Sequence, residues 1–403
     1  MNVNLVRKQL LECNVTAVLC QKINFQMGEV IFDCGSYSIK GGFSHQEEPF
    51  ELRTVIGHSH NEDNLPVLLT GEEALSKCAS SHGKVRLSTP VEEGFIDNFD
   101  RLELLLETVY AQNLVTDAAS HSVILAEPHY NPPKTRDKSV ELFFERFRVP
   151  SLNISQQGVL CLVGTGRITG VVVDCGHSAS TTVPLFESYG IPHSVNRTRL
   201  GGSHVNTALA KLLSLNGVAT LAKTKDMEIV KTLKERHCQL RLSSQDPGPS
   251  VSAPFSLPDG ETVVSLSSEL WRAPEGLFSP AVYGLECAGV AESLAASIKS
   301  APMDLTRPLL NSIVLCGGSS KLKNFEKRIA NDVKDLVAHQ VAREVRVTVA
   351  QNPVAAAWHG GKVFAGLRSG FTDRWMSRAE YFEYGAERMR RKLGDSPQKF
   401  DDD

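Results

Sequence analysis

Two stretches of this chain end an apolar run in the same way. Val30–Phe43 reads VIFDCGSYSIKGGF and Val171–Pro184 reads VVVDCGHSASTTVP, so each passes from a strand-like segment through Asp-Cys-Gly into a second strand. The spacing between the two aspartates, Asp33 and Asp174, is roughly 140 residues, which is too long for a solenoid repeat. It fits a duplicated α/β domain, and this pair of matched units constrains the fold more than any other feature.

A third glycine turn, Cys316-Gly317-Gly318-Ser319, also follows an apolar run. Glycine permits positive φ angles and close backbone approach, so that consecutive N–H groups can converge on an anion. Two such turns from opposite lobes could hold the β- and γ-phosphates of a nucleotide. The two aspartates would then face the water shell of a Mg²⁺ ion, which prefers octahedral oxygen ligands. Lys40 would add a positive charge near a phosphate.

A plainer interpretation is that each Asp-x-Gly is only a hairpin turn, because Asp and Gly are both common in turns. For a single copy that interpretation is the better one; two matched copies and a third turn favour the nucleotide site. The segment GTGRITG (Gly164, Gly166, Gly170) is close to a dinucleotide-binding fingerprint. Its last gap is too long and a strand follows it instead of a helix, so a Rossmann site is excluded.

The bulk properties exclude several classes of protein. A chain of 403 residues fits two lobes, and its net charge of -3 gives no basic face for nucleic acid. No run of about 18 apolar residues predicts a membrane span, and the N-terminus lacks a signal-peptide layout. The nine cysteines form no C-x-x-C pair, which favours a reducing compartment and argues against a thiolate metal site.

The order of elements predicts α/β architecture in both halves. Leucine spacing predicts a helix over residues 101–114, a buried strand is expected over 121–128, and residues 136–147 return to helical periodicity. A Pro-, Ser- and Gly-rich surface loop with a Pro-Asp-Gly turn is expected over 243–263. Residues 373–395 are predicted to form an amphipathic, basic helical region.

Taken together, these residues resemble the actin family. The segments DCGSYSIKGGF, TGEEALSK, TPVEEGFIDNFD, GRITGVVVDCG, LPDGETV, RAPEGLFSP, IVLCGG, AWHGGKVFAGL and MSRAEYFEYG follow the family's order from about Val30 to Lys392. The resemblance implies an actin-like ATPase-domain fold, with duplicated ribonuclease H-like domains forming two lobes around a nucleotide cleft. The implied organisation is an N-terminal extension (1–22), a first lobe (23–156 and 354–403, with a small subdomain at about 54–88) and a second lobe (157–353, with a subdomain at about 200–290).

The resemblance also implies a site for ATP or ADP with Mg²⁺. Asp33 and Asp174 match the aspartates that hold the metal through water, and Gln157 matches the residue that orients the attacking water. These three residues are the expected catalytic set. The expected nucleotide-binding residues are Gly35, Ser36, Lys40, Gly176, Gly202, Lys234, Glu235, Gly317, Gly318 and Ser319.

Several positions depart from the family's pattern, and they argue against efficient hydrolysis. His177 and Ser178 replace Asp and Gly in the second phosphate loop, and Thr181 replaces the histidine that helps to arrange the hydrolytic water. Further from the phosphates, Val354 replaces a lysine over the base, and Ser203 and His204 replace a charged pair near the ribose. Binding of ATP or ADP is therefore expected, with weak or absent turnover.

The segment 55–74 corresponds to the mobile loop that conventional actins insert into a neighbouring subunit. Here it is shorter and carries Glu62, Asp63 and Pro66, so it lacks an apolar tip to bury at such a contact. The expectation is a nucleotide-binding structural subunit of a larger cytoskeletal or chromatin complex, without extensive polymerisation. Its partners would be protein subunits, including actin or other actin-related proteins, in the cytoplasm and cytoskeleton or alternatively in the nucleus. Two alternatives remain open: an active ATPase that forms filaments, and a scaffold with no nucleotide.

Overall fold

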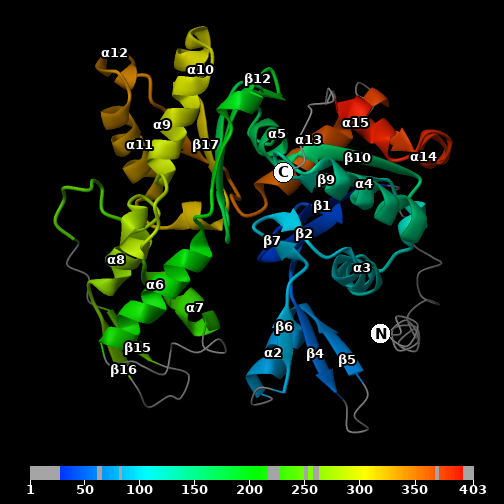
Figure 1. Cartoon of the computed structure of the whole chain (residues 1–403), viewed down its shortest axis with the longest axis horizontal. Coiled ribbons are helices and arrows are strands. Elements are labelled where there is room, and N and C mark those ends of the chain that lie inside the picture. Colours follow the sequence, from blue (N-terminus) through cyan, green and yellow to red (C-terminus); the bar gives the residue numbers. More distant parts are fainter. Residues whose placement is uncertain are drawn as a thin grey trace. The chain divides into compact units, whose positions relative to one another are not determined.

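The computed structural model of the protein describes residues 28–60, 66–80, 84–216, 227–248, 253–256, 263–367 and 372–393. The chain divides into two compact units, which are described separately (Figure 1). Unit 1 contains the residues up to Gln156 and from Gly361 onward, and unit 2 contains Gln157–Gly360. The predicted extension at residues 1–22 lies outside the described residues.

The second boundary falls at Gly360, later than the expected position at residue 354. The physical reason is the packing of helix α13 (Ala356–Gly366) on helix α5 (Gln157–Val163). A Cβ added at Gly360 would lie 1.8 Å from the carbonyl oxygen of Leu160, so the two backbones are in close contact there. The first half of α13 therefore belongs with unit 2.

Unit 1 is built on a mixed sheet of order β19-β10-β9-β1-β2-β3, in which β10, β9 and β1 are parallel. Strand β1 is buried at every position, Asp33 included, as its mainly apolar sequence predicts for a central strand. A separate three-stranded sheet, β5-β4-β6, packs against helix α2 as a small subdomain (Figure 1). The strands of unit 1 are β1 Val30–Cys34, β2 Ser38–Phe43, β3 Phe50–Arg53, β4 Ile56–His60, β5 Pro66–Thr70, β6 Arg86–Ser88, β7 Val91–Glu92, β8 Phe95–Ile96, β9 Val123–Glu127, β10 Ser151–Gln156 and β19 Met376–Ser377.

Unit 2 repeats this plan with a sheet of order β13-β12-β11-β17-β18, in which β11, β17 and β18 are parallel and β14 pairs with β12. A two-stranded sheet, β15-β16, lies apart from it. Strand β15 falls within the segment that was predicted to be a loop, while the Pro-Asp-Gly turn lies outside the described residues. The strands are β11 Gly170–Cys175, β12 Ser180–Phe186, β13 Tyr189–Gly190, β14 Asn196–Thr198, β15 Ala253–Ser256, β16 Val263–Leu266, β17 Ile313–Cys316 and β18 Val347–Val349.

The register confirms that the sequence repeat is a structural repeat. In unit 1, Asp33 pairs with Lys40 across the antiparallel β1–β2 hairpin and with Ala126 on parallel β9. In unit 2, Asp174 pairs with Thr181 across β11–β12 and with Cys316 on parallel β17. Each aspartate is therefore the second-last residue of a central strand, between a hairpin partner and a parallel neighbour. The α/β fold class is as expected.

Helices cover the sheets of both units. The predicted helix over residues 101–114 is present as α3 continued by a π-helical segment, and that over 136–147 ends in the same way. Helical segments of unit 1 are α2 Gly71–Ser80, α3 Phe99–Thr108, η2 Val109–Leu114, η3 Ala118–Ser120, α4 Pro133–Glu141, η4 Leu142–Arg146, η12 Thr372–Arg374, α14 Arg378–Tyr384 and α15 Glu387–Leu393. Besides α5 and α13, unit 2 contains η5 Pro192–Ser194, α6 Gly202–Leu215, α7 Met227–His237, α8 Glu269–Glu275, η8 Pro280–Tyr283, α9 Val290–Ser300, η9 Met303–Leu305, α10 Thr306–Leu310, η10 Gly318–Lys321, α11 Phe325–Leu336 and α12 His339–Ala342.

The C-terminal region is less regular than its amphipathic pattern predicted. Strand β19 adds to the edge of the unit 1 sheet beside β10, and two short helices follow it. Gly385, with φ of 73°, ends α14, because left-handed backbone cannot continue a right-handed helix. Each unit has its own hydrophobic core. Among the helices of the described residues, none combines the length and apolarity needed to cross a bilayer.

Candidate functional site

The first glycine turn joins β1 to β2 in unit 1 and is closed by the backbone. Gly35 N–H donates to the carbonyl of Ser38 at 3.2 Å, and the carbonyl of Gly35 accepts from Thr54 Oγ1 at 2.7 Å. Lys40 Nζ lies 4.0 Å from Asp33 Oδ2, and both side chains are mostly buried. The structure therefore brings Asp33, Gly35 and Lys40 together in one hairpin, with Ser36 in the turn between them.

In unit 2 the second turn, the start of α6 and the third turn converge on one carbonyl group. The carbonyl of Gly176 accepts from Gly202 N–H at 3.0 Å and from Ser319 Oγ at 3.2 Å. The neighbouring carbonyl of His177 accepts from Ser203 N–H at 2.8 Å. Three segments of unit 2 that are far apart in the sequence thus meet at these carbonyls.

Lys234 completes this group from the last turn of α7. Its Nζ donates to the carbonyl of Gly202 at 3.3 Å, and the side chain is buried. Burial lowers the pKa of the Lys234 amine, because a low-dielectric surrounding disfavours its charged form. We call the group formed by Gly176, Gly202, Lys234 and Ser319 the glycine cradle.

Gly202 of the cradle and Gly317 of the third turn leave little room for a Cβ. A Cβ at Gly202 would lie 3.1 Å from both Lys234 Nζ and Ser319 Oγ. Gly317 has φ of 80°, and a Cβ there would lie 2.4 Å from Asp174 Oδ1 and from the carbonyl oxygen of Cys175. The carboxylate of Asp174 therefore lies directly beside the third turn. Gly318 differs, because an added Cβ would meet no atom within 4 Å.

Besides the turn residues described above, two predicted residues of unit 2 are not members of this cradle. Glu235 follows Lys234, but its half-exposed carboxylate pairs with Lys231 at 3.8 Å along α7. Gln157 is the first residue of α5, which packs against β11 in unit 2. Asp33, Gly35, Ser36 and Lys40 belong to unit 1, whereas all the other predicted site residues belong to unit 2.

The cysteines beside the two aspartates are not reactive groups. Cys34 and Cys175 are buried, and burial raises the pKa of each thiol to about 12. Both thiols therefore stay protonated near neutral pH, when they are poor nucleophiles and poor metal ligands. Within the described ranges, no cluster of three or more His, Cys, Asp or Glu side chains could hold a metal directly. A metal held through water by two aspartates is a different kind of site.

Sequence reasoning missed some residues that shape these turns. A Cβ at Gly201 would lie 2.4 Å from the carbonyl oxygen of His177, so this glycine allows α6 to approach the second turn. The Gly201-Gly202 doublet was a usable signal for that approach. Thr54, which caps the first turn through its hydroxyl, lies in an ordinary polar stretch with no motif around it.

The donors in these turns suit a phosphorylated ligand. The hairpin of unit 1 carries a lysine, and the cradle of unit 2 carries a buried amine and a hydroxyl on glycine-rich backbone. Cationic side chains and closely approachable backbone are the groups that bind phosphates in proteins. Comparison of the chain with models of protein families matches the actin family model over residues 25–394. This match covers both units and almost the whole 403-residue chain, so the protein belongs to the actin family.

Proposed function

We propose that this protein binds ATP or ADP with Mg²⁺ and acts as a structural subunit of a larger protein complex. The observation that carries the nucleotide site is the convergence of three glycine-containing segments and a buried lysine at the carbonyls of Gly176 and Gly202. Folding brings these segments together from distant parts of the sequence, which isolated hairpin turns would not require. The actin-family fold generally binds ATP or ADP with Mg²⁺, which supports the same assignment.

Each group of residues has a separate role in this proposal. The hairpin of unit 1, with Gly35, Ser36 and Lys40, would contact phosphate oxygens, and the cradle of unit 2 would contact the rest of the nucleotide together with Gly318. The two aspartates would hold Mg²⁺ through its water ligands. The ion, when bound, would neutralise phosphate charge. Lys40 lies close enough to Asp33 to limit carboxylate repulsion of the phosphates.

Slow hydrolysis follows from the second turn. Thr181 pairs with Asp174 across the hairpin, where the family's pattern has an imidazole that helps to arrange the attacking water. A threonine hydroxyl is a weaker proton acceptor than imidazole and does not reach as far from the strand. Gln157 would be left to orient water alone. We expect hydrolysis to lose orders of magnitude in rate when such a positioning group is missing.

The role in a complex is inferred from the same departures. A nucleotide that is held but not turned over stabilises one conformation, and that conformation offers a fixed surface to partner proteins. We propose protein subunits as the partners, including actin or other actin-related proteins, in a cytoskeletal or chromatin assembly. The cytoplasm and cytoskeleton are the proposed location, with the nucleus as the alternative. The charged residues Glu62 and Asp63, which argue against filament contacts, lie outside the described residues.

Turnover and sedimentation assays test this function. We expect purified protein with MgATP to hydrolyse it far more slowly than a conventional actin, and to stay in the supernatant under polymerising salt. Gln157→Ala is the matched control, because a residual rate that arises at the proposed site should fall further in this variant. Fast turnover that depends on Gln157, together with pelleted polymer, would establish the active, filament-forming ATPase instead. Loss of all nucleotide effects on the protein would favour the scaffold without nucleotide.

A further inference from the structure

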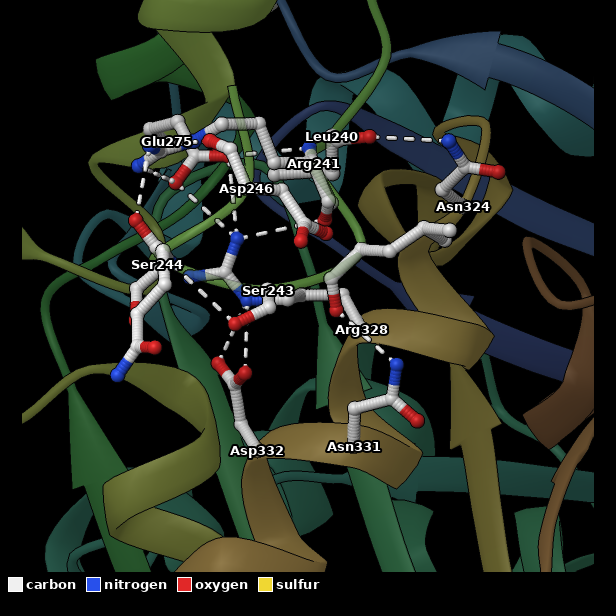
Figure 2. Close-up of polar contacts among 12 residues, drawn as sticks. Leu240, Arg241, Ser243, Ser244, Asp246, Glu275, Asn324, Arg328, Asn331 and Asp332 are labelled. Atoms are coloured by element: carbon white, nitrogen blue, oxygen red, sulfur yellow. Dashed lines mark hydrogen bonds and ion pairs between the residues drawn. The ribbon is translucent and has the colours of Figure 1, made fainter. Parts of the chain in front are cut away.

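A buried ionic network in unit 2 joins the segment after α7 to α8 and α11 (Figure 2). Its centre is Arg328 on α11, whose side chain is almost completely buried. Arg328 Nε donates to both carboxylate oxygens of Asp332, at 2.9 and 2.7 Å, and Nη1 donates to both oxygens of Glu275 at 3.1 Å. Arg241 Nη2 donates to the same Glu275 at 2.9 Å. Two positive and two negative groups therefore balance one another.

The network ties together two backbone segments as well as four side chains. Arg328 Nη1 also donates to the carbonyl of Arg241 at 3.3 Å. Asn324 Nδ2 donates to the carbonyl of Leu240 at 3.0 Å, and Leu240 N–H donates to the carbonyl of Lys323 at 3.0 Å. Asn331 Nδ2 donates to the carbonyl of Leu242, in the same segment, at 3.1 Å. The segment that follows α7 is thus fastened along the start of α11.

Each of the two segments joined by the network is close in sequence to a cradle residue. The segment around Leu240 directly follows α7, and the last turn of α7 carries Lys234. The N–H of Cys238, which lies between them in the chain, donates to the carbonyl of Lys234 at 3.1 Å. The start of α11 follows η10, which carries Ser319. Lys234 and Ser319 are the two side chains that reach the carbonyls of Gly202 and Gly176. Their separation therefore depends on how the two segments are held together.

We propose that Arg328 is a positioning residue, which sets the distance between Lys234 and Ser319 by locking the segment after α7 to α11. The inference rests on the nucleotide site proposed above. An apolar side chain could fill the same volume, but only a guanidinium can bond Glu275, Asp332 and a backbone carbonyl at once. Its planar fork fixes direction as well as contact, which is what positioning requires.

The first test uses the protein without nucleotide. Amide hydrogen exchange is compared between the wild type, Arg328→Met, and Leu309→Ala, a buried core variant on α10 in the same unit. The comparison is made at conditions where both variants have lost the same amount of melting temperature. Arg328→Met should then speed amide hydrogen exchange about tenfold in residues 234–242 and 317–324. Leu309→Ala should leave the exchange rates of both segments unchanged relative to the rest of unit 2. Equal, uniform acceleration in both variants would show that Arg328 is merely structural, and would overturn the proposal.

The second test measures affinity for MgATP in the same variants. Arg328→Met should bind about tenfold more weakly than Leu309→Ala, and Arg328→Lys should recover part of the loss. If Arg328→Met does not fold, Asn324→Gly replaces it in both tests. This variant removes the hydrogen bond from Asn324 to the carbonyl of Leu240, and glycine tolerates the φ of 71° at that position. It should show a smaller increase in hydrogen exchange in the same segments. Unchanged affinity in every variant would contradict positioning. Wild-type protein that binds no MgATP would instead overturn the proposed function, while the exchange result would still decide whether Arg328 holds the two segments.

Discussion

Replacing Gly360 with alanine is expected to lower the free energy of unfolding by about 3 kcal/mol. The added Cβ would lie 1.8 Å from the carbonyl oxygen of Leu160 and 2.4 Å from its carbonyl carbon. Both are backbone atoms of α5, so no side-chain rotation can relieve the overlap. The two helices would have to separate, and the buried side chains that pack around them would lose contacts.

Gly366 provides a matched control on the same helix. A Cβ there would meet no atom within 4 Å, and alanine is a better helix former than glycine by up to about 1 kcal/mol. Chemical denaturation monitored by circular dichroism should therefore show Gly360→Ala strongly destabilised and Gly366→Ala unchanged or slightly more stable. Similar stability for the two variants would mean that α5 and α13 do not pack as described.

Alanine variants of the neighbouring residues Gly317 and Gly318 should separate effects on protein stability from effects on MgATP binding. Gly317→Ala places a Cβ 2.4 Å from Asp174 Oδ1 on a residue with φ of 80°, so we expect it to cost about 2 kcal/mol of stability and to weaken MgATP binding. Gly318→Ala adds its methyl group to open space, so its stability should stay within about 0.5 kcal/mol of the wild type. If the third turn holds the nucleotide, that same methyl group should still weaken MgATP binding, by about tenfold.

Thermal denaturation and nucleotide titration of both variants check this pair. Normal affinity in Gly318→Ala would place the nucleotide away from the third turn. Normal stability in Gly317→Ala would show that the contact with Asp174 is not as close as the structure has it. The two outcomes are independent, because the first concerns the ligand and the second concerns the folded protein alone.

Much of the architecture could be predicted because its signals are local. Buried strands that end in Asp-Cys-Gly, at Asp33 and Asp174, predicted two equivalent hairpins, and the register confirms their equivalence. The glycine turn after Cys316 was equally visible. Each of these signals needs only a short window of sequence, since apolar runs and glycine report on strand burial and turn geometry directly.

Other features depend on contacts that no short window contains. The predicted C-terminal helical region is interrupted at Gly385, where one positive φ outweighs an otherwise amphipathic pattern. No sequence motif marks the ionic network of Glu275, Arg328 and Arg241, because it forms only when three separate segments of the chain pack together. Glu235 was assigned to the site by the family resemblance, and its role stays a prediction. A helix turns adjacent side chains in different directions, and the Glu235 carboxylate lies 3.8 Å from Lys231.

Titration of the protein with ATP in the presence and absence of Mg²⁺, for the wild type and for Asp33→Ala and Asp174→Ala, tests the central claim most directly. If Asp33 and Asp174 both contribute to the proposed binding of MgATP, wild-type protein should bind a single MgATP. Each substitution should then weaken that binding by about tenfold, with most of the loss disappearing when Mg²⁺ is removed. No binding at millimolar ATP, or an affinity that depends on only one of the two aspartates, would contradict the claim.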